Sequence, residues 1–163
     1  MEPTDTLSTI FSHNLWANLR LLDACAGLNS EQLNTSTSGG YGSIRNTFQH
    51  IVLAERSYYS RICTGQPYLR LKDAPPLSLP EMRDSLVESG KGLIEWVQMV
   101  KSKDIVLVDW DGTQREIPKT IILNQAINHA TEHRAQIMVI MTQLGIEPPD
   151  LDSWTYFDEL EKK

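Results

Sequence analysis

Residues 119–144 read KTIILNQAINHATEHRAQIMVIMTQL, and this stretch indicates both the fold and the chemistry of the chain. Its apolar residues recur every three or four positions, which is the period of one face of an α-helix. Gly145 follows as a helix stop, because glycine accepts the backbone conformations that end helices. We therefore predict one long amphipathic helix over 119–144, with an apolar face formed by Leu123, Ala126, Ile127, Ala130, Ile137, Met141 and Leu144.

Three further segments have the same helical period: residues 4–26, 44–63 and 80–101. Gly27 follows the first segment as a stop that tolerates a left-handed conformation, and Ser43 precedes the second as an N-cap. Four long amphipathic helices are typical of a four-helix bundle.

The segments between these helices are rich in turn-forming residues. Residues 29–41 are predicted to be a loop, and the proline-rich residues 66–80 form a connection long enough to run the length of a bundle. Asp111-Gly112 lies between two short runs with high β-propensity, which predicts a hairpin. The expected fold class is therefore all-α: a four-helix bundle with a small β-hairpin between helices three and four. It forms one domain over residues 1–163, whose tail, 148–163, adds a short helix or packs on the surface.

The composition excludes several classes of function. The chain has 163 residues, a net charge of -6 and a pI of about 5.2, which argues against general binding to nucleic acid or to anionic membranes. No apolar run approaches the roughly 20 residues that span a bilayer. The first residues are acidic and polar, unlike a secretory signal. We expect a cytoplasmic protein.

His129 and His133 are the strongest indication of a site. Their spacing of four residues puts both side chains on one face of the helix, in the middle of its apolar stripe. Two imidazoles so placed can share one metal ion, although two core histidines hydrogen-bonded to their neighbours would show the same pattern.

A third histidine, His50, lies at the edge of the apolar face of the second helix. Three imidazoles suit Zn, Ni, Fe or Cu better than Mg or Ca, and they leave an open position for water or a substrate. Asn14 and Asn18 occupy positions in the apolar stripe of the first helix where leucine would be expected. We predict that they border a polar pocket near the ion. The alternatives are hydrogen bonds to the backbone across the bundle, or a rotation of the first helix that exposes both side chains.

Glu132 lies beside the histidine pair in the run HATEH, residues 129–133, which matches the inverted zinc-protease motif HxxEH. In that motif the glutamate is the general base. Known enzymes with this motif are much larger and need another acidic ligand, so the match alone is weak. A catalytic role for Glu132 therefore stands beside its interpretation as a solvated carboxylate.

Three stretches together carry a resemblance to a known family: HNLWANLRLLD at 13–23, YGSIRNTFQHIVLAERSYYSRI at 41–62, and the hairpin with the last long helix at 109–152. In these stretches the chain resembles the DinB/YfiT-like superfamily of metal-dependent proteins. The most specific piece is HRAQ at 133–136, followed by LGIEPP at 144–149. The family usually has HRGQ, and Ala135 stands in place of the glycine.

The resemblance implies a four-helix bundle that binds a divalent metal through His50, His129 and His133. We expect Zn or Ni as the ion, with Fe or Mn as alternatives. It also implies homodimers. Some relatives transfer low-molecular-weight thiols such as bacillithiol, mycothiol or glutathione.

Three functions follow as hypotheses. The first is a metal-dependent transferase that uses a low-molecular-weight thiol. The second is a hydrolase that activates a metal-bound water, with Glu132 as the base. The third is a metal-binding or interaction protein without turnover.

Overall fold

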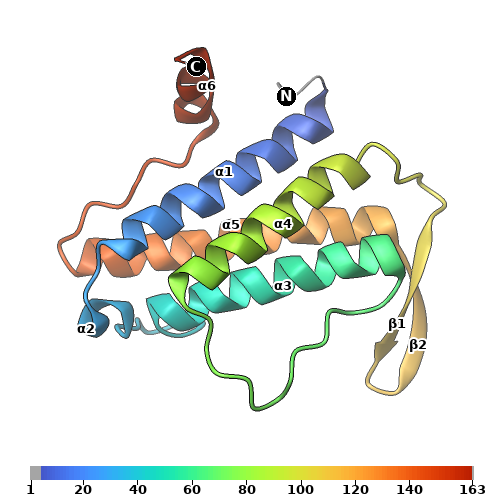
Figure 1. The fold of residues 1–163 in the computed structure, drawn as a ribbon, viewed down its shortest axis with the longest axis horizontal. Helices are drawn as coiled ribbons and strands as arrows, with labels where there is room; N and C mark the ends of the chain where they lie inside the picture. Colours follow the sequence, from blue (N-terminus) through green and yellow to red (C-terminus); the bar gives the residue numbers. More distant parts are fainter. Residues whose placement is uncertain (1–4, 163) are drawn as a thin grey trace.

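The computed structural model describes residues 5–162, which are mostly helical with a small two-stranded antiparallel sheet (Figure 1). The elements in this range are α1 (Thr6–Ala26), α2 (Ser30–Leu33), α3 (Ile44–Thr64), α4 (Leu79–Trp96), β1 (Ile105–Trp110), β2 (Thr113–Pro118), α5 (Lys119–Gln143) and α6 (Ser153–Glu161). None of the helices between residues 5 and 162 combines the length and the apolarity needed to cross a membrane.

Local signals in the sequence fix most helix ends. The Ser43 side chain accepts a hydrogen bond from the Asn46 N–H at 3.2 Å and starts α3, as predicted. Gly65 and Gly145 follow α3 and α5 with φ of 75° and 72°, a conformation that costs glycine little. Gly27 ends α1 as predicted, but its φ is -80°, so it does so without the left-handed conformation that glycine tolerates.

The hairpin forms where Asp111-Gly112 predicted it. Both residues have positive φ, 53° and 79°, as a two-residue turn of type I′ requires. The Gly112 N–H donates to Asp109 Oδ1 at 2.8 Å, and Ile105 pairs with Pro118 at the open end of the ladder. The sheet therefore delivers the chain directly to the start of α5.

Two boundaries differ from the prediction. The loop predicted over 29–41 contains the short helix α2, because Asn29 and Gln32 form a reciprocal capping box. The third helix, predicted to reach residue 101, ends at Trp96. The Asp104 carboxylate accepts a hydrogen bond from the Lys101 N–H at 2.9 Å, and this turn replaces the last predicted helical residues.

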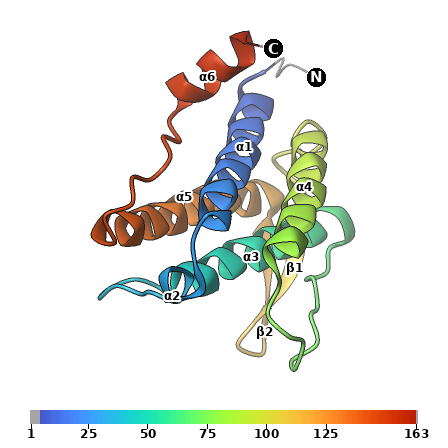
Figure 2. The same cartoon turned by 60° about the vertical axis from the view of Figure 1, so that its left-hand side comes forward.

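The four long helices pack in a ring of neighbours: α1 contacts α4 and α5, and α3 contacts the same two helices. Figure 2 shows α3 and α5 side by side beneath α1. The ring of Tyr59 on α3 lies directly against Gly92 on α4, where a side chain would overlap it. The proline-rich connection carries the chain back along α3 before α4 begins (Figure 1).

The buried apolar residues form two clusters. One gathers around Leu21, Phe48 and Ile137, and the other around Phe11 and Leu93. The tail forms α6, which contacts α1. The Trp16 indole N–H donates to Glu159 at 2.8 Å, which ties this last helix to the first.

Candidate metal centre

His50 on α3 and the pair His129 and His133 on α5 form one cluster. Each side chain is half-buried, and one ligating nitrogen from each lies within 4.8 Å of the other two. The cluster forms because α3 and α5 pack directly against each other, while the spacing of four residues puts His129 and His133 on the same face of α5. The structure thus brings together the three residues predicted to bind metal.

The donor atoms fit a shared ion. His129 Nε2 lies 2.9 Å from His50 Nε2. Two nitrogens that bind one tetrahedral ion at about 2.1 Å lie about 3.4 Å apart, so His50 and His129 need little movement to share an ion. Burial lowers the pKa of His50 and lowers that of His129 to about 4, with a smaller contribution from neighbouring histidines. Both rings are therefore neutral near pH 7, which is the form that binds metals.

The side chain of Gln136 contacts the Nδ1 nitrogen of His133. Its Oε1 accepts a hydrogen bond from the Tyr41 backbone N–H at 3.1 Å and lies 3.1 Å from His133 Nδ1. Because a carbonyl oxygen can only accept, Nδ1 must carry the proton, and the lone pair of this ring is left on Nε2. Gln136 is the last residue of the HRAQ run, but the sequence did not predict this contact.

Two tyrosines border the histidines. Tyr41 stacks on His50 with ring centroids 4.0 Å apart, and Tyr58 meets His129 edge-on at 5.8 Å. Tyr41 is 55% exposed, so this side of the cluster faces solvent. A small molecule can therefore approach the histidines from the side of Tyr41.

Asn14 and Asn18 are buried on α1, as their place in the apolar stripe predicted, but their partners differ from those expected. Both amide nitrogens donate to Glu55 Oε2, at 3.1 and 3.0 Å. Both amide oxygens accept from Arg134 Nη1 at 2.7 Å. Their hydrogen bonds are thus made across the packed helices and not to the histidines. Asn14 also lines a cavity of about 200 Å³ between α1, α5 and α6.

Glu55 and Arg134 are functional-site candidates that the sequence reasoning missed. Burial raises the pKa of Glu55, although Ser89 donates to its other oxygen at 2.7 Å. Burial lowers the pKa of Arg134 to about 10, so the guanidinium stays charged at neutral pH. Both residues fall in the apolar stripes of their helices, and this position was the available signal.

Glu132 is exposed on α5, and its side chain makes no hydrogen bond or ion pair among residues 5–162. It neighbours His133 in the sequence, but the adjacent position on a helix points in a different direction. Its catalytic role stays a prediction.

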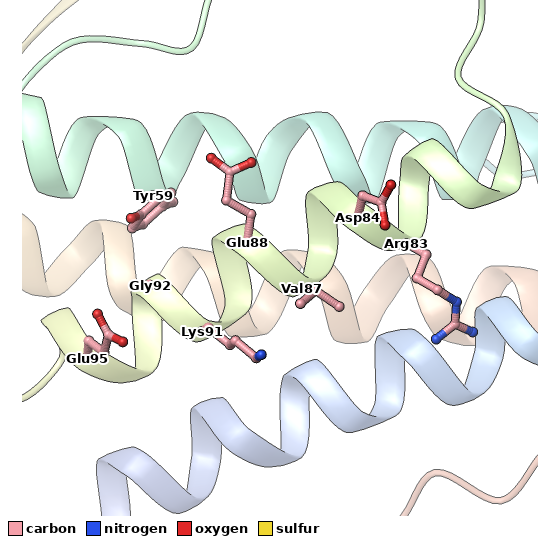
Figure 3. Close-up of a pocket in the computed structure, with 8 residues that line it drawn as sticks. All are labelled: Tyr59, Arg83, Asp84, Val87, Glu88, Lys91, Gly92 and Glu95. Carbon is pink, nitrogen blue, oxygen red and sulfur yellow. The ribbon is translucent and has the colours of Figure 1, made fainter.

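Figure 3 shows a cavity elsewhere on the molecule, bordered by Tyr59 and by one side of α4. Arg83, Lys91 and Glu95 give its wall charges of both signs. It includes none of the predicted site residues, and most of its wall belongs to a single helix. We therefore do not assign the site to this cavity.

The comparisons with known proteins agree with the sequence resemblance. The profile of the DinB family matches residues 1–162. A crystal structure of a DinB-like protein from Bacillus cereus ATCC 10987 is similar with a TM-score of 0.62 and 25% identity, over 85% of this chain and 91% of that one. A DinB-like protein from Bacillus subtilis has a similar fold, with a TM-score of 0.61 and 12% identity over 88% and 97% of the two chains. No curated protein matches the chain.

Proposed function

The chain belongs to the DinB family, and we propose that it is a metal-dependent protein in which His50, His129 and His133 bind one divalent ion, Zn or Ni in preference to Fe or Mn. The observation that carries this proposal is the approach of the three ligating nitrogens to within 4.8 Å of one another. All-nitrogen ligation suits these ions better than Mg or Ca. The four long helices act as the bundle that holds the ligands in place.

The reaction we propose is the transfer of a low-molecular-weight thiol to a small molecule. A bound divalent ion would lower the pKa of a thiol at its open position, so that the nucleophilic thiolate forms near neutral pH. The chain itself supplies orientation: Gln136 fixes the proton of His133 on Nδ1. The ring of Tyr41 covers one face of His50, while the half-buried cluster stays open to a substrate.

Metal titration tests the first part of the proposal. Protein without a histidine tag, treated with chelator and titrated with Zn²⁺ in a calorimeter, should bind one ion per chain. His129→Ala and His133→Ala should each lose most of this affinity. His13→Ala is the matched control, because His13 lies outside the cluster. Its Nε2 is hydrogen-bonded to the Leu151 carbonyl oxygen at 2.8 Å. Equal binding by the His129 variant and the parent would contradict the proposal.

Cobalt spectra test the reaction. The visible spectrum of the Co²⁺-loaded protein should shift when glutathione, bacillithiol or mycothiol is added. A shift with one thiol supports the transferase. If no thiol changes the spectrum and the metal-loaded protein hydrolyses generic esters, the protein is a hydrolase and the proposed thiol transfer is wrong. If neither occurs, the protein binds metal without turnover.

A further inference from the structure

A cavity of about 520 Å³ lies between α3, α5 and the hairpin. Val108, Ile117 and Ile122 contribute an apolar wall, while Tyr58, Arg61 and Gln125 contribute polar groups. Pockets for small ligands have this size and this pattern of apolar walls with a few polar groups. None of the sequence motifs pointed to this cavity.

The cavity lies one helical turn from the histidines. Ala54 lines it and follows His50 by four residues on α3, and Gln125 lines it and precedes His129 by four residues on α5. Residues at this spacing are neighbours on one helix face, about 6 Å apart. Tyr58 borders both sites, since its ring meets His129 edge-on at 5.8 Å. A molecule in the cavity would therefore reach the metal cluster with one end.

Arg61 gives the cavity a charge. Its side chain is half-buried, and among the described residues 5–162 no carboxylate forms an ion pair with it and no hydrogen bond involves its guanidinium. A guanidinium presents a planar set of donors that matches the two oxygens of a carboxylate. The other described arginines of α3 and α4 that lie near acidic groups are paired, such as Arg56 with Glu88 at 3.0 Å.

We propose that this cavity binds a small molecule with an apolar body and a carboxylate, with the carboxylate on Arg61 and the opposite end directed toward His129. The charge complementarity and the apolar wall define this class of ligand. The role of the second end as the reacting group rests on the proposed function, whereas binding of the carboxylate does not.

A matched pair of compounds tests the proposal by calorimetry on the full chain. The probes are 4-phenylbutyrate and 4-phenylbutan-1-ol, which share the apolar body and differ in the carboxylate. The parent should bind the carboxylate at least about tenfold more tightly than the alcohol. Arg61→Gln should remove this preference. Arg45→Gln, which makes the same charge change on the same helix outside the cavity, should keep it. Equal binding of the two compounds, or a preference that survives in Arg61→Gln, would overturn the proposal.

Chemical-shift mapping on the parent gives a readout that does not depend on the stability of a variant. Amide signals of Gln125 and its neighbours in the cavity should move when 4-phenylbutyrate is added. Changes confined to the cavity of Figure 3 would contradict the assignment. So would an absence of binding combined with signals that depend on protein concentration, because a second copy of the chain would then cover the cavity. His129→Ala separates the two proposals: it should lose the metal and keep the preference for the carboxylate.

Discussion

Glu55 on α3 and Arg134 on α5 are joined through the side chains of Asn14 and Asn18 and not by a direct ion pair. Each asparagine donates to the carboxylate and accepts from the guanidinium. Ser89 on α4 completes the network, which therefore links all four long helices. It lies between the two apolar clusters of the core, because α1, α3 and α4 each continue into a different cluster on either side of their polar residues. A polar layer of this kind favours one helix register over others, since a shifted register would leave buried charges unpaired.

The variant Asn18→Leu tests the network. Leucine can neither donate to Glu55 nor accept from Arg134, and the site is fully buried. We expect a loss of about 1–3 kcal/mol in the free energy of unfolding, measured by urea denaturation of the metal-free protein. The affinity for Zn²⁺ should stay unchanged, because Asn18 does not contact the histidines. Asn124→Leu, at an exposed position on α5, should change stability by less than about 0.5 kcal/mol. A more stable Asn18 variant would show that the network is not needed.

The raised pKa of Glu55 predicts a pH dependence of stability. Burial raises this pKa above the ordinary value of 4.5, so the folded protein binds the proton more tightly than the unfolded chain does. The contribution is fully present below pH 4.5 and is lost as the pH rises through the folded pKa. In urea denaturation at a series of pH values, the stability of the parent relative to Glu55→Gln should therefore fall as the pH rises above about 4.5. If the difference in unfolding free energy between the parent and Glu55→Gln stays constant or grows with pH, the prediction is wrong.

Local patterns predicted most of the fold because the responsible contacts lie within a few residues. Ser43 caps α3 through Asn46, and Asp111-Gly112 needs only its own backbone to turn the chain. The same rule explains the errors. The capping box of α2 is also local, but it lies within a polar segment that predicted a loop. The turn at Asp104 is local as well, but the helical period before it predicted that the third helix continues to residue 101.

The site was predictable only as far as residue type and spacing carry information. His129 and His133 share a helix face by spacing, and His50, at the edge of the apolar face of the second helix, was the third histidine that could join them. Contacts between distant segments gave no such signal: Tyr41 reaches His50 from the loop before α3, and Gln136 joins the Tyr41 backbone to His133. Arg134 was overlooked because it follows a histidine motif, although its place in the stripe indicated burial.

Removal of the metal should weaken the protein without unfolding it. The core has two apolar clusters of its own, so folding does not depend on the ion, unlike in a small zinc finger. At a free ion concentration of 100 times the Kd, binding raises the free energy of unfolding of the protein by about 2.7 kcal/mol. This corresponds to a rise in Tm of about 5–10 °C for a chain of this size. Adding a chelator should lower Tm by this amount and leave the helical circular dichroism at 25 °C intact. The Tm of His129→Ala should not respond to chelator, and unfolding of the parent at 25 °C would contradict the prediction.

Gln136 should tune metal affinity through His133. Gln136→Leu removes the acceptor at His133 Nδ1, so the ring loses its fixed tautomer and orientation, and the Tyr41 N–H loses its partner as well. Losses of this kind typically weaken metal binding by about 10–100-fold. We expect such a loss for Zn²⁺ in calorimetry, with one ion per chain still bound at saturation. Gln136→Glu keeps an acceptor oxygen and should recover most of the affinity, while Gln143→Leu at the exposed end of α5 should bind like the parent. If Gln136→Leu also binds like the parent, then packing of the rings alone orients His133.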